Sequence, residues 1–305
     1  MKLELVPRLC PLCGSAESRL RTKARIDESR LTVSAFASRK LPEFMHLAMV
    51  ECASCRLLYA NPVPRPETLA QAYREAAFVS RPESRCAALT YRKLTEARLN
   101  LLPARESALD IGAGDGAFVE QLLDLGFAQV VGVEPSLASI AAAPPAIRGL
   151  LRNALFEASA FRPNSLDLIS CFQVLEHLPE PAKTVREAYS LLKPGGLLII
   201  VAHDLRALSA RLLGTRSPIY DIEHLQLFDR RTGSMLLQKA GFEIVAIEAV
   251  RNCYPLDYWL RLAPLPAAVK PLAGAAARRT GAGDLRITLS AGNLAFTARK
   301  PTASA

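Results

Sequence analysis

The chain has 305 residues, of which 50% are hydrophobic and 22% charged, a composition typical of folded globular proteins that excludes a disordered chain. Its net charge of +9 comes from Lys and Arg that are mostly interleaved with acidic residues, which indicates a basic surface more than a nucleic-acid-binding stripe. No apolar run reaches the roughly 18 residues of a membrane-spanning helix, and the first residues lack a signal-peptide pattern, so we expect a cytoplasmic protein.

Two pairs of cysteines lie within residues 1–65, which we expect to fold as a small zinc-ribbon-like module. Cys10 and Cys13 enclose two residues, as do Cys52 and Cys55. Two such pairs suit one tetrahedral Zn(II), because each pair can bind the metal from a tight turn. The alternatives are a redox dithiol, although neither pair starts a helix in a thioredoxin-like context, and four unconnected buried thiols. Four cysteines leave no open coordination position, so we predict a structural metal that takes no part in chemistry.

The segments that follow change from helical to alternating character. Residues 66–102 are predicted to form a helical linker, because apolar residues recur there at helical spacing. In the segment 103–250 strands alternate with helices, which predicts a parallel sheet with helices on both faces and therefore an α/β fold. The expected strands are residues 107–112, 129–135, 146–151, 166–172 and 197–203.

The first of these strands runs into a glycine-rich turn, LDIGAGDGAF at 109–118. Such turns hold nucleotide-type cofactors, and Glu134 follows at the distance where an acid binds a ribose. Dinucleotide enzymes use G-x-G-x-x-G, but Ala117 breaks that spacing, and Asp110 and Asp115 would repel a pyrophosphate. The same carboxylates favour a cation. S-adenosylmethionine carries a sulfonium and an ammonium, so we predict this cofactor over NAD.

Five motifs between about 105 and 250 resemble the successive motifs of class I S-adenosylmethionine-dependent methyltransferases. They are LDIGAGDGAF, VVGVEPS, SLDLISCFQVLEHLPEP, LLKPGGLLII and AGFEIVAIE, in this order. The N-terminal CPLCG, then CxxC and LLYANPVPRPETL, is similar to a zinc-binding segment in bacterial enzymes of this kind that act on sugars, glycans or related metabolites. The resemblance implies a Rossmann-like seven-stranded sheet whose last, antiparallel strand is LSAGNLAFTARK. The large C-terminal domain of sugar C-methyltransferases has no counterpart here, which makes carbon methylation the less expected reaction.

The resemblance also implies which residues contact the cofactor, and for three of them there is an alternative role. Leu155 and Phe156 could equally be core residues, and Gln173 could cap a helix. Asp167, which is not among the implied residues, is more often structural in this fold. The implied residues are Asp110, Gly112, Gly114 and Asp115 at the amino-acid and sulfonium end, Glu134 at the ribose, Pro135 and Ser136 beside the adenine, Leu155 and Phe156 flanking the ring, and Gln173 and Val174 where cofactor and acceptor meet.

Methyl transfer to a hydroxyl oxygen also needs a group that accepts the proton, and a histidine or carboxylate can serve. We predict that His224 is this base or orients the acceptor, because residues 219–228 should cross above the carboxyl edge of the sheet. Glu223 or Asp221 would hold its tautomer. His177 is the second candidate, and a packing or capping role is the alternative for both. The chain has four histidines, His46, His177, His203 and His224.

Residues 251–305 are expected to form a lid-like insertion and the final antiparallel strand. The stretch 254–279 mixes aromatic with basic residues and is cut by prolines. We expect it to lie on an anionic membrane surface as a peripheral contact or to close over an acceptor, with packing against the sheet as the alternative.

The sequence therefore predicts an S-adenosylmethionine-dependent methyltransferase with structural Zn(II) that methylates oxygen on a small-molecule, sugar or glycan acceptor. An RNA methyltransferase is the main alternative. Nucleic acid is the less expected partner, because no basic stripe with interleaved aromatics is visible and aromatics make up only 6% of the chain. A non-catalytic protein that keeps the cofactor fold is a third possibility, against which the intact glycine turn and Glu134 argue.

Overall fold

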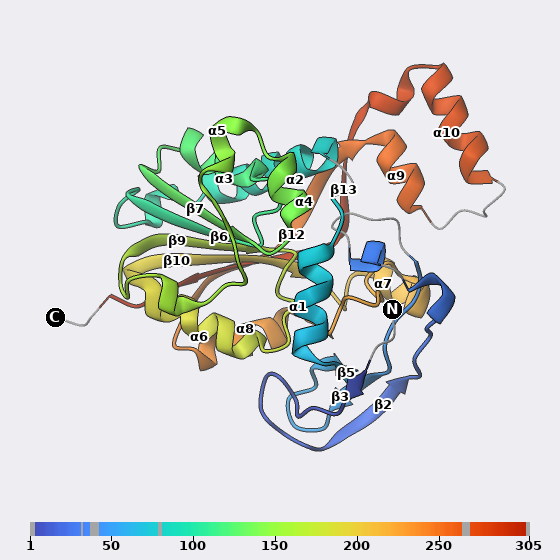
Figure 1. The fold of residues 1–305 in the computed structure, drawn as a ribbon, viewed down its shortest axis with the longest axis horizontal. Helices are drawn as coiled ribbons and strands as arrows, with labels where there is room; N and C mark the ends of the chain where they lie inside the picture. Colours follow the sequence, from blue (N-terminus) through green and yellow to red (C-terminus); the bar gives the residue numbers. More distant parts are fainter. Residues whose placement is uncertain (1–3, 32, 37–42, 79–80, 264–268, 303–305) are drawn as a thin grey trace.

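A seven-stranded sheet forms the centre of the molecule (Figure 1). The fold is that of a computed structural model, which describes residues 4–31, 33–36, 43–78, 81–263 and 269–302. The strand order is β12-β13-β10-β9-β6-β7-β8, and β13 runs antiparallel to both of its neighbours while the others are parallel. This confirms the predicted Rossmann-like sheet and its antiparallel last strand. The strands are β6 (Ser107–Ile111), β7 (Gln129–Glu134), β8 (Leu151–Asn153), β9 (Leu166–Phe172), β10 (Leu192–His203), β12 (Glu243–Pro255) and β13 (Arg286–Arg299).

Both faces of this sheet are covered, as the nearly continuous apolar strands require. Along β9 every residue is buried, and its apolar side chains divide between two apolar clusters. Ile169 packs in the cluster beneath one pair of helices, and Leu168 in the cluster beneath the other. The first pair is α6 (Pro181–Leu191) and α8 (Arg230–Lys239), and the second is α2 (Arg81–Glu96) and α3 (Ala117–Asp124).

One predicted strand, over residues 146–151, is wrong. The structure has a turn of helix, α5 (Pro145–Arg148), and the strand β8 begins only at Leu151. Pro145 occupies the first helical position, where its fixed φ angle suits a helix and its lack of an N–H costs nothing. The remaining helices of the sheet region are α4 (Leu137–Ala142) and α7 (Leu208–Leu213), and short 3-10 turns lie at Glu28–Arg30, Val33–Phe36, Leu99–Leu101, Ala158–Ala160, Gly214–Arg216 and Ala282–Asp284.

The N-terminal strands form two small sheets. β1 (Leu5–Val6) pairs with β5 (Val63–Pro64), and a four-stranded sheet has the order β11-β4-β3-β2. Its fourth strand, β11, comes from far along the chain, so that Tyr59 pairs with Gln226. The N-terminal module is thus joined by backbone hydrogen bonds to the segment that follows His224. These strands are β2 (Ser18–Thr22), β3 (Met49–Cys52), β4 (Leu58–Ala60) and β11 (Gln226–Leu227).

The predicted helical segment 66–102 consists of two main helices, α1 (Pro66–Glu75) and α2. α1 buries Leu69 and Ala72 in a cluster shared with the N-terminal strands, whereas α2 packs on the central sheet. Both helices therefore belong to packed cores.

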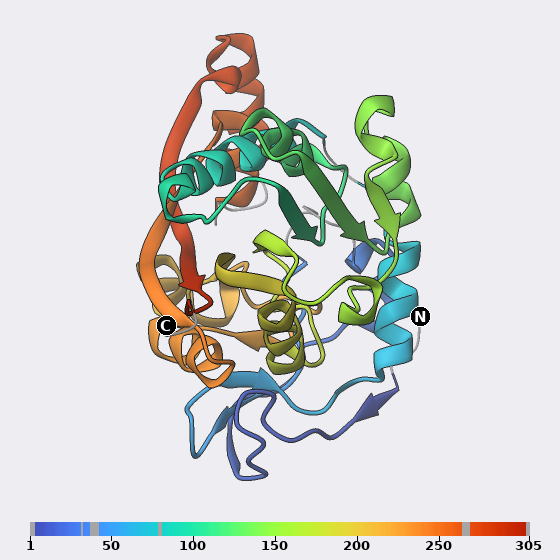
Figure 2. The same cartoon turned by 90° about the vertical axis from the view of Figure 1, so that its left-hand side faces the viewer.

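Beyond the edge of the sheet, β12 and β13 continue as a two-stranded ribbon in which Tyr254 pairs with Ile287. The ribbon carries α9 (Leu256–Leu262) and α10 (Val269–Arg279), which lie at the opposite end of the molecule from the N-terminal strands (Figures 1 and 2). Residues 264–268 of the predicted membrane-contact segment lie outside the described residues. No helix within the described ranges has the length and apolar character needed to cross a bilayer.

Candidate functional site

A cavity of about 880 Å³ lies where β6, β7, β9 and β10 end. Ligands of open α/β sheets bind at this edge. Every residue that the resemblance implies for cofactor contact lines this cavity, together with three histidines. The cavity also reaches α1 through Tyr73 and α9 through Tyr258 and Trp259.

The glycine turn after β6 needs glycine for two different reasons. Gly112 has φ +75°, and a Cβ on it would lie 2.3 Å from Cγ2 of Val174. Gly114 has φ +57°, but a Cβ there would meet nothing within 4 Å. The first glycine lets the turn pack against the segment after β9, and the second supplies a left-handed conformation beside open space.

Glu134, at the end of β7, ties this turn to the next one. Its carboxylate accepts hydrogen bonds from the N–H of Gly114 (2.9 Å) and of Ser136 (2.8 Å). Burial raises the pKa of Glu134, and these two donors oppose the rise. The Ser136 hydroxyl accepts from the N–H of Ser139 at the start of α4 and donates to the carbonyl of Ala76 after α1. Ser136 thus links the end of β7 to the start of α4 and to the residue after α1, at the wall of the cavity.

Carboxylates set the charge of the cavity. Asp110 is buried and accepts a hydrogen bond of 2.6 Å from Ser170 Oγ. Burial raises its pKa to about 7, a rise that the Ser170 hydrogen bond opposes and the charge of Glu134 increases. Asp115 accepts from Ser84 Oγ of α2 at 2.9 Å. Among the described residues that line the cavity there is no Lys or Arg, although the chain carries +9 overall; the acids are Asp110, Asp115, Glu134, Asp221 and Glu223.

The other predicted cofactor residues differ in their surroundings. Gln173 has φ +57°, rare for a residue other than glycine, and its Nε2 is buried with no hydrogen-bond partner among the residues that the structure describes. The nearest following helix, α6, begins at Pro181, so Gln173 does not cap it. Leu155 is 39% exposed, and Phe156 packs beside Phe161 with ring centroids 6.3 Å apart. A buried donor without a partner indicates a place for a ligand acceptor atom.

Asp167 lies away from the cavity and has a structural role. Its carboxylate accepts from the N–H groups of Glu106 and Ser107 before and at the start of β6, and it contacts Lys193.

Three imidazoles meet in the cavity wall. The ring centroid of His224 lies 4.9 Å from that of His177 and 4.9 Å from that of His203. Nδ1 of His224 is 2.8 Å from the carbonyl oxygen of Ile219, so this nitrogen carries the hydrogen and Nε2 carries the lone pair. From the sequence we expect Glu223 or Asp221 to hold the tautomer, and at Nδ1 the structure shows the carbonyl of Ile219. Nδ1 of His203 is held in the same way by Oδ1 of Asn293, at 2.9 Å.

Two carboxylates accompany these rings. Glu176 is 1% exposed, and its Oε1 accepts from the N–H of His203 at 3.2 Å. Glu223 Oε2 lies 3.7 Å from Nδ1 of His177, and the Tyr73 hydroxyl lies 3.3 Å from the same nitrogen. The sequence did not indicate Glu176 or Tyr73. Glu176 directly precedes His177, a signal that could have been read, whereas Tyr73 comes from α1 and carries none.

The N-terminal module reaches the loops of this histidine cluster through Arg8 and through β11, the strand that pairs with its β4. The side-chain amide of Gln226 in β11 donates to the carbonyls of Leu175 (2.8 Å) and Leu178 (2.9 Å), on either side of His177. Arg8 donates to the carbonyls of Ala60 and Leu225, which links β4 to the residue after His224. The loops that carry His177 and His224 are therefore braced from the module.

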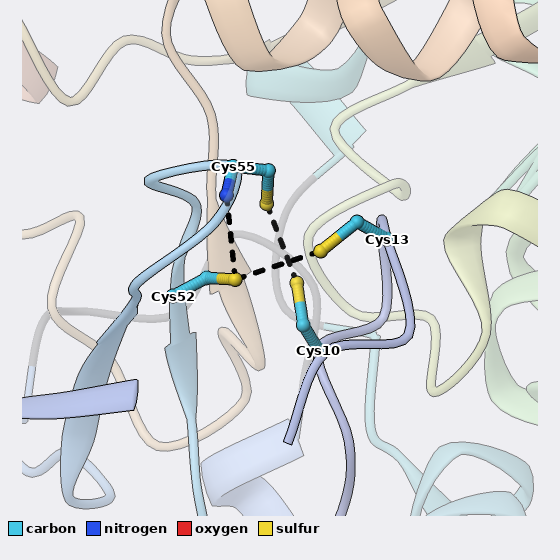
Figure 3. Close-up of side chains that lie close together, drawn as sticks. All are labelled: Cys10, Cys13, Cys52 and Cys55. Carbon is cyan, nitrogen blue, oxygen red and sulfur yellow. Dashed lines mark hydrogen bonds between the residues drawn. The ribbon is translucent and has the colours of Figure 1, made fainter. Parts of the chain in front are cut away.

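The four cysteines of the module come together in space (Figure 3). Their sulfur atoms all lie within 4.8 Å of one another, with 3.4 Å between Cys10 and Cys55 and 3.5 Å between Cys13 and Cys52. Tetrahedral Zn(II) with Zn–S bonds of about 2.3 Å places its sulfurs about 3.8 Å apart. The donor set and its spacing fit a structural zinc, which this cluster could hold.

Backbone geometry and hydrogen bonds prepare these thiols. A residue in the left-handed backbone conformation follows each cysteine pair, Gly14 at φ +77° and Arg56 at φ +65°. Burial disfavours the thiolate of Cys52, but the N–H groups of Cys55 and Ser54 outweigh it and lower the pKa of Cys52 to about 7. Burial raises the pKa of Cys10 to about 11. A bound cation would therefore be needed to hold all four as thiolates.

The aromatic residues of the segment 254–279 turn inward. Tyr258 and Trp259 line the cavity, and Trp259 Nε1 donates to the carbonyl of Ile287 at 2.9 Å. Arg261 pairs with Glu83 of α2. Tyr258 and Trp259 thus belong to the cavity wall, and the roles of this segment at a membrane or over an acceptor stay predictions.

Comparison with known proteins identifies a methyltransferase domain in this chain. A sequence model described as a methyltransferase domain matches residues 83–247. A ubiquinone biosynthesis O-methyltransferase of Xanthomonas euvesicatoria is 36% identical over 109 residues, which are 34% of this chain and 44% of that protein. The protein of the same name from Albidiferax ferrireducens is 33% identical over 100 residues, 30% of this chain and 39% of that protein. This chain thus spans about half the length, or less, of the curated relatives it matches.

Among solved structures, a putative methyltransferase from Bacillus halodurans aligns with a TM-score of 0.49 and 20% identity, over 69% of this chain and 98% of that one. The methyltransferase-domain match covers more than half of the 305 residues. The chain belongs to this methyltransferase domain family.

Proposed function

We propose that this chain is an S-adenosylmethionine-dependent methyltransferase that methylates a hydroxyl oxygen of a small-molecule, sugar or glycan acceptor. The observation that carries the proposal is an acidic cavity, with no Lys or Arg among its described lining residues, that ends at a cluster of imidazoles. The acids suit a cationic cofactor, and the imidazoles suit a proton that must be removed. The names of the curated relatives support transfer to oxygen.

Each end of the cofactor has candidate partners. When bound, S-adenosylmethionine supplies a methyl group on a positively charged sulfur. Asp110 and Asp115 would attract its charged end, and the unused lone pairs of the Glu134 carboxylate would accept hydrogen bonds from the ribose. Gln173 Nε2, which is buried and has no partner in the described part of the chain, would donate to the ligand.

His224 would take the proton of the acceptor hydroxyl. Its Nδ1–H is bonded to Ile219, so its lone pair is on Nε2, beside His177 and His203. His177, near Glu223 and Tyr73, is the second candidate. The chain's other contribution is placement, because well-aligned reacting groups reach effective molarities of about 10⁵ M or more.

The side chains that line the cavity favour some acceptors over others. Leu69, Tyr258 and Trp259 offer apolar surface for a ring or an aliphatic body. The lack of Lys and Arg among the described lining residues disfavours a phosphorylated acceptor, and it also weighs against RNA, whose affinity depends on phosphate contacts.

Cofactor binding is the first test. Calorimetry should give tighter binding of S-adenosylmethionine and of its demethylated product than of NAD, because the turn is acidic and unsuited to a pyrophosphate. Tighter binding of NAD would end the methyltransferase proposal. A salt-sensitive shift with RNA would favour the RNA-modifying alternative.

His224→Ala tests the base, with labelled methyl transfer to a panel of hydroxyl compounds as the assay. Turnover should fall by about 10²–10⁴-fold while cofactor affinity stays nearly constant. His46→Gln is the matched control, since His46 is buried but does not line the cavity. Turnover within a few-fold of wild type would move the role to His177 or to no protein base.

A further inference from the structure

Two histidines of the cavity wall and a buried glutamate behind them form a group of possible metal ligands. One ligand atom from each of Glu176, His203 and His224 lies within 4.8 Å of the other two. Nε2 of His203 is 3.8 Å from Oε1 of Glu176. Zn–N and Zn–O bonds of about 2.0–2.2 Å place ligand atoms about 3–3.5 Å apart, so shifts of about 1 Å would close these three around one ion.

Both histidines are oriented as metal ligands usually are. Carbonyl oxygens only accept hydrogen bonds, so Ile219 O and Asn293 Oδ1 fix the hydrogen of His224 and of His203 on Nδ1. In each neutral ring the second nitrogen, Nε2, is then the atom that can act as a metal ligand. Metal-binding histidines almost always donate their other N–H to such a carbonyl or carboxylate, which sets the tautomer and the ring plane.

Glu176 supplies an independent observation. Its side chain is 1% exposed, and Oε2 has no hydrogen-bond partner among the described residues. An isolated buried carboxylate oxygen is costly, and buried charges are normally paired or bound to metal. A cation between Glu176 and the two imidazoles would satisfy this oxygen.

We infer that Glu176, His203 and His224 form a second metal site, separate from the four cysteines, which binds one divalent first-row transition ion. Mixed imidazole and carboxylate ligands suit Zn(II) or Fe(II) rather than Ca(II) or Mg(II). Three protein ligands leave coordination positions open. Because His203 and His224 line the cavity, those positions can be reached from it.

The role of the ion rests on the proposed function. A divalent ion held here would make an acceptor hydroxyl more acidic, and His177, whose ring lies 4.9 Å from that of His224, would accept the proton. The oxygen keeps the electron pair of the broken O–H bond. A ligating His224 could not also accept the proton, so with the ion bound the base would be His177, the second candidate named above; without the ion His224 keeps the role of base.

Cobalt(II) uptake by the intact, zinc-loaded chain tests the site without any assay of turnover. Visible absorption without thiolate charge-transfer bands reports a nitrogen and oxygen site, whereas those bands report cobalt in the cysteine cluster. Wild type should bind one such cobalt per chain. Glu176→Gln and His203→Ala should weaken this binding by at least about 10- to 100-fold, the loss caused by removing even an outer partner of a ligand.

Matched variants identify the site. His46→Gln should leave cobalt affinity unchanged, and so should Glu223→Gln, which alters the neighbouring set of His177, Glu223 and His224. His203 is partly exposed and tolerates truncation better than Glu176, so His203→Ala keeps the test open if Glu176→Gln fails to fold.

Three results would overturn the inference. The first is that no second ion binds at millimolar cobalt, and the second is that wild type, Glu176→Gln and His203→Ala bind cobalt with equal affinity. The third is that Glu223→Gln loses cobalt binding while Glu176→Gln keeps it. Calorimetry with S-adenosylmethionine on the same samples separates the two proposals: cofactor binding without a second ion removes only the metal site, and an ion without cofactor binding removes only the methyltransferase proposal.

Discussion

Asp110 shows how a single buried carboxyl can serve binding at the expense of stability. Its pKa is raised from 3.8 to about 7, chiefly by burial. Between these two values the folded chain holds a proton that the unfolded chain has lost. Stability therefore falls as pH rises from about 4 to 7, and a cation bound near Asp110 would offset the cost of the charge.

Asp110→Asn should remove this pH dependence. The variant should match wild type near pH 4 and exceed it in free energy of unfolding at pH 8, because the amide is never charged. Denaturant melts at both pH values measure the difference. A variant that is less stable than wild type at pH 8 would contradict the prediction.

Cofactor affinity should depend on pH in the direction opposite to stability. Wild-type affinity for S-adenosylmethionine should increase as pH rises through about 7, when Asp110 becomes charged. Asp110→Asn should bind more weakly and with a flatter profile in calorimetry between pH 6 and 8. Parallel profiles in the two proteins would place the titrating group elsewhere.

Glu134→Ala should weaken cofactor binding by about 1.5–3 kcal/mol, the value of a hydrogen bond to a charged group. The variant also frees the N–H groups of Gly114 and Ser136, so its melting temperature must be measured alongside. Glu157→Ala, an exposed position, is the control. Unchanged affinity would mean that the end of β7 does not hold the ribose.

At the scale of elements, the turn after β6 and the segment after β9 are fitted to each other. Gly112→Ala should destabilise the chain by about 2–5 kcal/mol, because the left-handed conformation costs about 1–2 kcal/mol and the contact with Val174 adds an overpacking cost of about 1–3 kcal/mol. Chemical denaturation measures it.

Val174→Ala in the same chain should recover the overpacking part, which a double-mutant cycle isolates as a coupling energy. Gly149→Ala is the matched control, since a Cβ there meets nothing within 4 Å and φ is −67°. Strict additivity of Gly112→Ala and Val174→Ala would show that the contact does not limit the turn.

The sequence predicted those elements whose signals are local. The glycine turn and Glu134 are recognisable because their spacing is fixed by one strand-turn-helix unit and the next strand. The prediction of a strand over 146–151 was wrong because a short apolar run of this kind suits a strand and a turn of helix equally well, and here Pro145 starts a helix. β11 has two residues, too few for any periodicity, and its pairing with β4 depends on tertiary structure alone.

The histidine cluster could be predicted only in part for a similar reason. His177 and His224 follow from motifs, but Tyr73 and Asn293 reach the cluster from α1 and β13. Sequence separation hides such neighbours. The roles of the site residues and the division of the chain at residues 65, 102 and 250 stay predictions.

At the scale of the whole molecule, the cysteine module and the main sheet share one apolar core. Cys52→Ser should reduce metal content below one zinc per chain and lower the melting temperature by at least a few degrees, because Cys52 and Leu57 pack in the same cluster as Phe296 of β13. Cys253→Ser, outside the cysteine cluster, is the control. A fully folded chain without zinc would contradict the assignment.

The same variant should reduce turnover more than cofactor affinity. Arg8 of the module, and Gln226 of the strand that pairs with it, donate to carbonyls in the loops of His177 and His224, whereas their side chains do not donate to the glycine turn. Equal losses in turnover and cofactor binding would indicate general unfolding.

The pairing of β4 with β11 also sets an order of events during synthesis. All four cysteines are made once residue 55 has been added, so the module can bind zinc early. Gln226, the partner of Tyr59, follows roughly 170 residues later, which takes on the order of 10–30 s at typical translation rates. Until then β4 is an unpaired strand edge, of the kind that attracts other chains. A ribosome that stalls before residue 226 would therefore release a zinc-bound fragment prone to association.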